Sequence, residues 1–299
     1  MRAAGGWVCC GRASGEVGQP EHKFACISFT HSARFGRRSA WRTPTTSAIR
    51  AHLPSYPRLP KEEKHALLTS VVARCAHAPG AARSVVVFDL DGTIMDNRPR
   101  TCAILRDFAT RVEGRNPAVA KRLFAVEPHE LAYLITDTLE KLGIDDEAIV
   151  LDASAFWRER FFIDDHLTHD VEVAGAGEFA RACYKAGAIL VYLTGRDLPL
   201  MGIGSFRSLR DLGFPIGVAG TELVLKPDAS MADDVFKRDT APEIARVGRI
   251  IASFDNEPAN TNIFLRLYPD ATSVLVDTQH APGGTTRYVS SLGETKTCP

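Results

Sequence analysis

The sequence predicts an α/β fold, a three-layer parallel Rossmann-like sheet with an inserted α-helical domain. Two observations favour this fold. Short apolar runs rich in β-branched residues, such as Ser84–Phe88 and Ile189–Leu193, have the character of strands buried on both faces, as in parallel sheets. Segments with helical apolar spacing alternate with these runs, and this alternation is typical of right-handed crossovers between parallel strands.

Composition indicates a folded chain with a full-sized core. The chain has 299 residues, of which 45% are apolar and 24% charged, and its seven cysteines form no Cys-X-X-Cys pair. These values argue against a disordered chain, a disulfide scaffold and a zinc ribbon, and no apolar run has the length of a membrane helix. We therefore expect reduced thiols and a cytoplasmic protein that binds no membrane.

The N-terminal segment differs from the rest of the chain. Residues 1–58 hold eight Arg and one Lys against two Glu, and they show neither helical nor strand periodicity. We interpret them as a disordered or leader-like segment; an organelle transit peptide has a similar composition. The remaining chain is mildly acidic, which argues against nucleic acid as a partner. Ordered structure is expected from a helix over Lys61–Arg74, which has an acidic first turn.

The first strand, Ser84–Phe88, ends in two carboxylates. Asp89 and Asp91 follow it, separated by one residue, and Gly92 and Thr93 come next. Ligands of open α/β sheets bind at the carboxyl ends of the strands. Two acids this close together need a cation or a shared proton. The glycine lets backbone amides approach an anion, and the threonine adds a hydroxyl donor.

Two later strands also end in polar residues. The strand Ile189–Leu193 and the strand Arg249–Phe254 are both apolar. The residues that follow are Thr194, Gly195 and Arg196 after the first, and Asp255, Asn256 and Glu257 after the second. The run VVVFDLDGT, followed in order by these two motifs, resembles the haloacid dehalogenase-like (HAD) hydrolase superfamily over roughly residues 84–278.

The resemblance implies a role for each motif. Asp89 would be the nucleophile, Asp91 the general acid and base, and a lysine would neutralise charge. The residues implied in phosphate binding are Gly92, Thr93, Thr194, Gly195 and Arg196. The implied ligands of Mg²⁺ are Asp89, Asp91 through its main-chain oxygen, Asp255 and Glu257. Glu257 departs from the usual spacing, so that it acts through a water or only caps the helix begun by Pro258.

Two lysines compete for the third motif. Lys226 ends a predicted strand and precedes Pro227, whereas Lys237 lies near the start of a helix expected over residues 239–247. One helix and one strand fit comfortably between Lys237 and Asp255, with connections of ordinary length. We therefore favour Lys237.

The resemblance also indicates a reaction. Members that act as dehalogenases generally lack the second carboxylate, and the ATPase branch has Lys where this chain has Leu90. We expect a Mg²⁺-dependent phosphohydrolase that cleaves a small phosphorylated metabolite through an aspartyl-phosphate. A phosphomutase of the same superfamily and a catalytically inactive HAD-like binding protein are the alternatives. A receiver domain is disfavoured because its phosphoaccepting Asp follows an earlier acidic pair.

The insert between the first two motifs is expected to be a helical cap over residues 97–167. Three sets of apolar residues with helical spacing support it: 104, 105, 108 and 112; 131, 134, 135, 139 and 142; and 149, 153, 156, 157 and 161. The stripe Phe156, Trp157 and Phe161 is interpreted as cap core rather than a base-stacking platform. Arg98 and Arg100 are interpreted as exposed hinge residues. The group Asp164, Asp165, His166, His169 and Asp170 has the residue types of a metal site but is interpreted as a polar linker.

The core domain is expected to comprise residues 59–96 and 168–279. Its later elements are helices over Gly204–Leu212, 239–247 and Pro258–Leu267, and strands over Gly217–Leu225 and Ser273–Val276. The chain from Thr278 onward, with the tail 280–299, is expected to be peripheral. The oligomeric state stays open.

Overall fold

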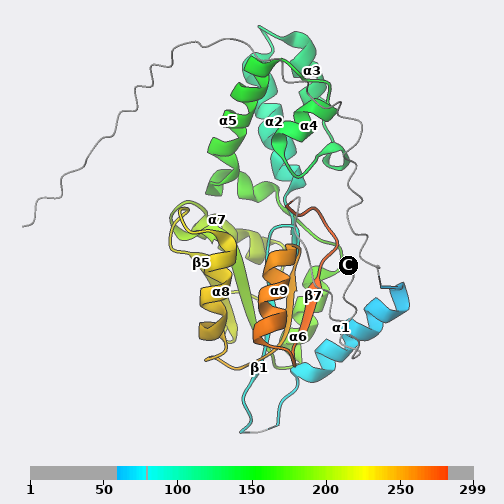
Figure 1. Ribbon diagram of the computed structural model, residues 1–299, viewed down its shortest axis with the longest axis vertical. Coiled ribbons are helices and arrows are strands. Elements are labelled where there is room, and N and C mark those ends of the chain that lie inside the picture. The colour runs from blue at the N-terminus through cyan, green and yellow to red at the C-terminus, as the bar shows by residue number, and fades with distance from the viewer. Residues whose placement is uncertain (1–58, 79, 282–299) are drawn as a thin grey trace, which may run out of the picture. The chain divides into compact units, whose positions relative to one another are not determined.

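The computed structural model describes residues 59–78 and 80–281, so the expected segment 1–58 and residues 282–299 of the tail lie outside the described residues. Its centre is a five-stranded sheet in the order β5-β4-β1-β6-β7, and every pair of neighbouring strands is parallel (Figure 1). The strands are β1 (Ser84–Phe88), β4 (Ile189–Asp197), β5 (Thr221–Lys226), β6 (Arg249–Asp255) and β7 (Thr272–Leu275). The α/β fold with a parallel sheet is thus confirmed.

Helices cover both faces of this sheet. The two faces form because side chains alternate along each strand: Val86 and Phe88 of β1 join one apolar cluster, and Val85 and Val87 join another. The first cluster includes residues of α1 (Lys61–Cys75), α6 (Ala176–Lys185) and α7 (Leu198–Asp211). The second includes residues of α8 (Asp233–Ile244) and α9 (Pro258–Leu267). Burial on both faces accounts for the uninterrupted apolar sequence of β1.

Four helices form the insert that follows the first motif. They are α2 (Arg98–Val112), α3 (Pro117–Phe124), α4 (Ile135–Lys141) and α5 (Glu147–Phe161), with short 3₁₀ turns η1 (Pro128–Glu130) and η2 (Asp164–His169). These helices share an apolar cluster of their own, which includes Phe156 with Trp157 and Phe161 packed against it. The interpretation of that aromatic stripe as cap core is therefore confirmed.

A short ribbon joins the insert to the core. Strand β2 (Met95–Asp96) precedes α2, strand β3 (Val171–Glu172) follows η2, and the two pair antiparallel. Both connections of the cap therefore run side by side.

Several element boundaries differ from the expected ones. Helix α7 begins at Leu198 and α8 at Asp233, both about six residues earlier than expected, and β5 begins only at Thr221. Of the apolar set 131–142, only Ile135 and Leu139 lie within a helix, α4, whereas Leu131 and Leu134 precede it with extended backbone and Leu142 is its C-cap. The helix α6 was not anticipated.

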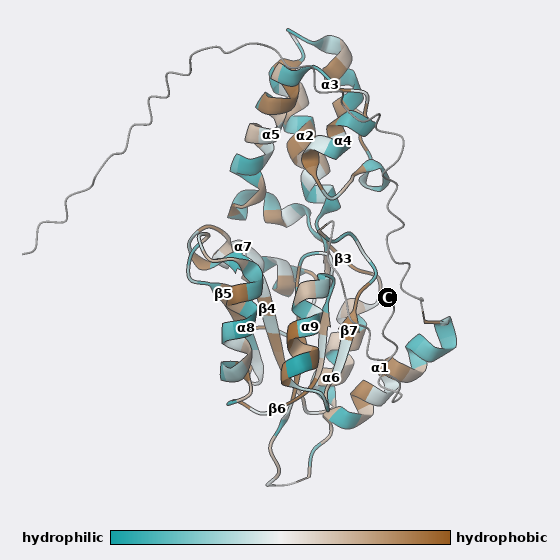
Figure 2. Cartoon of the chain, in the orientation of Figure 1, coloured by the Kyte–Doolittle hydropathy of each residue, from teal (hydrophilic) through white to brown (hydrophobic). Residues whose placement is uncertain are grey.

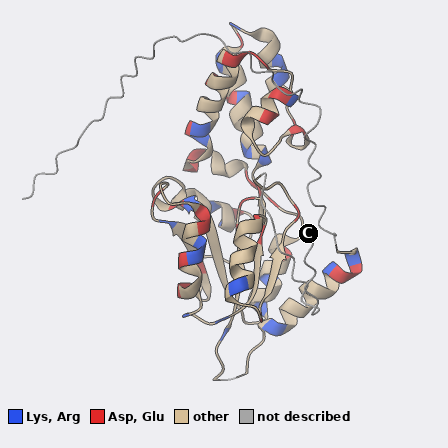
Figure 3. Cartoon of the chain, in the orientation of Figure 1, with Lys and Arg blue, Asp and Glu red and all other residues tan. Residues whose placement is uncertain are grey.

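Apolar and charged residues are distributed as this layering requires. The strands of the sheet are largely brown in the hydropathy colouring and largely free of Lys, Arg, Asp and Glu (Figures 2 and 3). Charged groups occur mainly on helices and near strand ends. Within the described part of the chain, no helix combines the length and the apolar character needed to cross a membrane.

Candidate active site

The strand register brings the three motifs to one edge of the sheet. Phe88 of β1 lies opposite Tyr192 of β4 and Phe254 of β6. The next residues along these parallel strands therefore emerge together at the carboxyl edge. Asp89 follows Phe88 and Asp255 ends β6, so the first and fourth motifs are neighbours although 166 positions separate them in sequence.

One buried lysine joins the two aspartates. The Lys237 Nζ lies 2.7 Å from Oδ1 of Asp89 and 2.6 Å from Oδ2 of Asp255. All three side chains are less than a tenth exposed. Lys237 comes from α8, and Phe236 of the same helix packs in the apolar cluster on this face of the sheet. This packing positions α8 so that the ammonium group of Lys237 reaches the two carboxylates.

Burial and charge shift the pKa values of this group. Burial raises the pKa of Asp89 to about 7, with Lys237 opposing the change and Asp255 adding to it. Burial alone would lower the pKa of Lys237, but Asp255 and Asp89 raise it above its ordinary value. The lysine therefore stays charged between the two carboxylates.

The loop after β1 folds back on Asp89. The Oγ1 of Thr93 donates to Oδ2 of Asp89 at 3.0 Å and accepts from the backbone N–H of Asn256 at 3.0 Å. Gly92 has φ +73°, and a Cβ there would overlap the side-chain amide of Asn256. Position 92 thus requires glycine for two reasons: its positive φ and the lack of space for a Cβ beside Asn256.

The second motif lies at the end of β4. Thr194 is buried, and its Oγ1 accepts from the backbone N–H of Arg196 at 3.2 Å. A Cβ on Gly195 would overlap the carboxylate of Asp233. That carboxylate is 2.7 Å from the Nζ of Lys226, which also donates to the carbonyl of Met231. The structure therefore brings Lys237, and not Lys226, to Asp89 and Asp255.

Two arginines hold Asp91. Arg196 donates from Nε to Oδ2 at 2.7 Å and from Nη2 to Oδ1 at 2.8 Å, and Arg100 donates from Nη2 to Oδ1 at 2.8 Å. Burial would raise the pKa of Asp91, but Arg196 and Arg100 together hold it well below its usual range. Arg196, predicted to bind phosphate, is thus engaged with a catalytic candidate in this structure.

Sequence reasoning missed two members of this group. Arg100 was interpreted as an exposed hinge residue, but its side chain is fully buried; Arg98 is partly exposed and pairs with Asp96. Asp170 is also fully buried and pairs with both Arg100 and Arg196. Only the positions of the two residues, close to the two ends of the predicted cap, could have suggested this pairing.

The polar residues of η2, where the chain leaves the cap, do not form one cluster but contact separate partners. Asp164 accepts from the backbone N–H of Gly204 at 2.7 Å, and His166 lies 3.1 Å from Asp107. No group of three or more His, Cys, Asp or Glu side chains arranged to hold a metal ion occurs among residues 59–78 and 80–281.

Glu257 is bound by the chain that follows the last strand. Both of its carboxylate oxygens accept from the backbone N–H of Ala281, at 3.0 and 3.2 Å, and burial raises its pKa. Glu257 occupies the N-cap position of α9 but makes no side-chain capping bond.

Residues 278–281 are not peripheral, in contrast to the expectation. Thr278 donates from Oγ1 to the carbonyl of Gly92, and Asn256 donates to the carbonyl of Gln279 at 2.6 Å. Gln279 in turn donates to the carbonyl of Leu131 in the cap at 2.6 Å. This short segment therefore contacts the first motif, the fourth motif and the cap.

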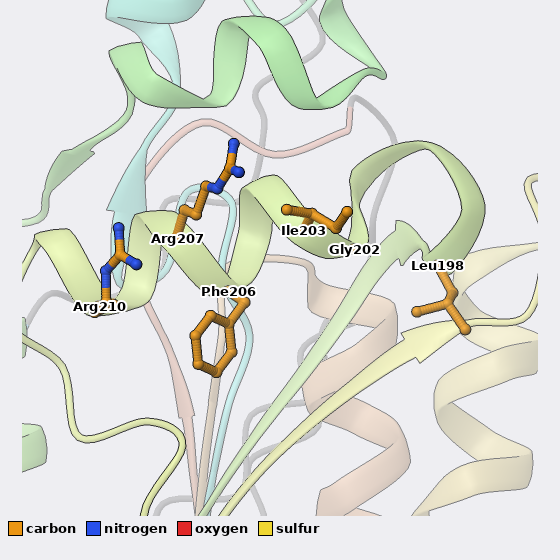
Figure 4. A pocket seen from close by; sticks show the side chains of 6 residues that line it. All are labelled: Leu198, Gly202, Ile203, Phe206, Arg207 and Arg210. Carbon is orange, nitrogen blue, oxygen red and sulfur yellow. The ribbon is translucent and has the colours of Figure 1, made fainter.

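A surface hollow on α7 contains none of the predicted site residues. Figure 4 shows its lining: Leu198, Gly202, Ile203, Phe206, Arg207 and Arg210. Its lining includes two arginines but no carboxylate, cysteine or histidine.

Comparison with known proteins gives structural likeness only. No family model and no curated protein matches the chain. Similar solved structures include the class C acid phosphatase from Bacillus anthracis, with 10% identity and a TM-score of 0.40 over 72% of this chain and 73% of that one. Protein Tyrosine Kinase A from Mycobacterium tuberculosis has 17% identity and a TM-score of 0.38 over 73% and 93% of the two chains. A haloacid dehalogenase-like family hydrolase from Streptococcus pneumoniae has 12% identity and a TM-score of 0.35 over 61% and 79%.

Proposed function

We propose that this chain is a phosphohydrolase that cleaves a small phosphomonoester through an aspartyl-phosphate on Asp89, with Mg²⁺ as its cofactor. The observation that carries the proposal is the buried contact of Lys237 with Asp89 and Asp255 at the carboxyl edge of the sheet. It joins the first and fourth motifs, and the second motif ends on the neighbouring strand β4.

The reaction has two steps. In the first, a carboxylate oxygen of Asp89 attacks phosphorus, the bond from phosphorus to the leaving oxygen breaks, and Asp91 gives its proton to that oxygen. In the second, water attacks phosphorus, Asp91 takes the proton of the water, and the bond to Asp89 breaks. Inorganic phosphate is then released and the free carboxylate of Asp89 is regenerated.

The arginines around Asp91 fit both of its roles. In the free site they favour the ionised carboxylate, which is the form that acts as base in the second step. A phosphate dianion bound beside Asp91 would repel its negative charge, and this repulsion would favour the protonated form that the first step needs.

The charge of the site supports a cation. When both are ionised, Asp89 and Asp255 carry two negative charges against the single charge of Lys237, while Asp91 and Asp170 are balanced by Arg100 and Arg196. A phosphate dianion would add to this excess of negative charge. The oxygen donors available for Mg²⁺ are the carboxylates of Asp89 and Asp255 and the main-chain oxygen of Asp91, a set that suits this hard ion. Bound Mg²⁺ would supply charge neutralisation at the phosphoryl oxygens.

The phosphate itself would meet neutral donors. The hydroxyl of Thr194 and the backbone N–H of Gly195 lie at the same sheet edge as Asp89, and we assign them to the phosphate oxygens. The backbone N–H of Gly92, by contrast, already donates to the carbonyl of Met95 at 2.8 Å.

Release of inorganic phosphate from a panel of phosphomonoesters tests the proposal. We expect turnover of at least one compound with Mg²⁺, none with excess EDTA, and none with Asp89→Asn in either condition. Asp107→Asn is the matched control, because Asp107 lies in the cap and pairs with His166. The reaction is not this one if Asp89→Asn retains more than about a tenth of the wild-type rate. Transfer of phosphate between two positions of one substrate, without release, would favour the phosphomutase.

A further inference from the structure

Four charged side chains form one closed group behind the reacting centre. They are Asp91, Arg100, Asp170 and Arg196, and the side chains of the last three are at most 2% exposed. Asp170 Oδ2 accepts from Nη2 of Arg100 at 2.6 Å and from Nη2 of Arg196 at 2.7 Å. Its Oδ1 accepts from Nε of Arg100 at 2.8 Å. Asp170 thus holds both guanidinium groups that hold Asp91.

The group draws its members from three places in the fold. Arg100 lies in the first turn of α2, where the chain enters the cap, and Asp170 directly precedes β3, where the chain returns. Arg196 belongs to β4, next to the phosphate-binding candidate Thr194. Asp91 alone is accessible, at 29% side-chain exposure, so it is the member of the group that faces solvent or substrate.

The remaining donors of the arginines are also engaged. Arg100 donates from Nη1 to the carbonyl of Phe161 at 3.1 Å and lies 4.4 Å from the centre of the Phe161 ring. Arg196 donates from Nη1 to Oγ of Ser205 at 3.2 Å. Because each guanidinium group is held by contacts on several sides, its orientation is fixed, and so is the direction of the N–H groups that it donates to Asp91.

We propose that Asp170 is a positioning residue for the reaction: through Arg100 and Arg196 it fixes the orientation in which the carboxyl group of Asp91 transfers its proton to the leaving oxygen. This inference rests on the proposed function. Without the second carboxylate, both arginines would share one acceptor, and buried guanidinium groups left without a partner move or draw in water. Asp91 would then lose the fixed geometry that proton transfer requires.

Leaving groups of different basicity separate this role from a purely structural one. An alkoxide must be protonated as it leaves, whereas 4-nitrophenolate departs without a proton. Asp170→Asn should therefore lower kcat/KM, which reports the first step and not the shared hydrolysis of the aspartyl-phosphate, about 10²-fold for an alkyl phosphate and by less than about threefold for 4-nitrophenyl phosphate, since general acid catalysis contributes factors of this size. A loss of packing alone would slow both substrates equally.

Three further variants complete the experiment. Arg100→Lys keeps the positive charge, but a lysine cannot bridge Asp91, Asp170 and Phe161. This variant should therefore show the same difference between the two substrates. It replaces Asp170→Asn in the test if circular dichroism shows that Asp170→Asn does not fold. In an Asp91→Asn background, Asp170→Asn should cause no further loss for the alkyl phosphate. Asp96→Asn, which alters the neighbouring pair with Arg98 on the same ribbon, should leave both rates near wild type.

The outcomes distinguish the two proposals. Wild-type protein that releases phosphate from no compound of the panel, these two substrates included, overturns the proposed function and this inference with it. Wild-type turnover together with an equal loss on both substrates in Asp170→Asn and Arg100→Lys overturns the positioning role alone. Additive losses in the Asp91→Asn background would overturn it as well.

Discussion

At the scale of single residues, Lys237 is the positive charge that offsets the carboxylates of Asp89 and Asp255. Its ammonium contacts Asp89 and Asp255, and no other Lys or Arg contact to either carboxylate occurs in the described ranges 59–78 and 80–281. Lys237→Ala should lower kcat on the order of 10²-fold, about 3 kcal/mol, because the nucleophile and the phosphoryl oxygens lose their neutralising charge. Lys226→Ala, which removes only the pair with Asp233, should stay within about threefold of wild type. Phosphate release measured for both variants decides the assignment, and equal losses would contradict it.

The raised pKa of Asp89 makes a second prediction, about stability. Because the folded-state value of about 7 exceeds the ordinary 3.8, protonated Asp89 stabilises the metal-free protein at low pH, and this contribution is lost as the pH rises towards 7. Asp89→Asn mimics the protonated form. Its melting temperature in EDTA should exceed that of wild type by several degrees at about pH 8, with the difference shrinking towards about pH 5. Parallel melting curves over this range would contradict the shift.

At this scale, the sequence predicted which residues lie at the site, but not those whose partners are distant in the sequence. The motif residues Asp89, Thr194 and Asp255 could be located because each follows a recognisable strand, and parallel strands share one edge. The partners of Arg100 could not, because Asp170 lies 70 positions later and reaches Arg100 only through the return of the cap.

At the scale of elements, strands were located more closely than helices. Helix α8 was expected over 239–247 because Asp233 and Asp234 continue an acidic segment that resembles a loop, yet they form the acidic first turn of the helix. Pro242 lies within the helix near its end and did not break it. As a result, Lys237 stands inside α8 rather than before it, and the helix fixes its direction more firmly than a loop would.

The turn after β1 leads to a third prediction. Gly92 and Gly143 have nearly the same φ, +73° and +72°, but a Cβ at 143 meets nothing within 4 Å, whereas at 92 it overlaps Asn256. Gly143→Ala should cost about 1 kcal/mol of unfolding free energy, from the positive φ alone. Gly92→Ala should cost about 1–3 kcal/mol more, from the overlap. Urea denaturation of both variants measures the difference, and equal costs would show that the Asn256 side chain moves aside freely.

At the scale of the whole molecule, the described residues connect cap and core in several ways. The β2–β3 ribbon carries both connections, the four-residue charged group lies beside it, and the segment Thr278–Ala281 reaches Leu131 independently. The two apolar clusters of the core and that of the cap are separate. Polar contacts of this kind open at lower cost than an apolar interface, so we expect the cap to open without unfolding of the core.

Two truncated chains separate the contribution of the C-terminal segment. A chain that ends at Ala281 keeps every contact described above, whereas one that ends at Thr278 loses the bonds of Gln279 to Leu131 and Asn256 and of Ala281 to Glu257. Neither truncation removes apolar core, so both chains should melt within a few degrees of each other. The shorter one should be cleaved several-fold faster by a protease in the cap around Pro128–Leu134, because loss of the tether raises the population of the open cap. Its KM should rise more than its kcat falls, since substrate then binds a less closed site. Identical cleavage rates and identical KM values in the two chains would mean that the remaining contacts, namely the ribbon, the charged group and the bonds of η2 to α7, are enough to hold the cap.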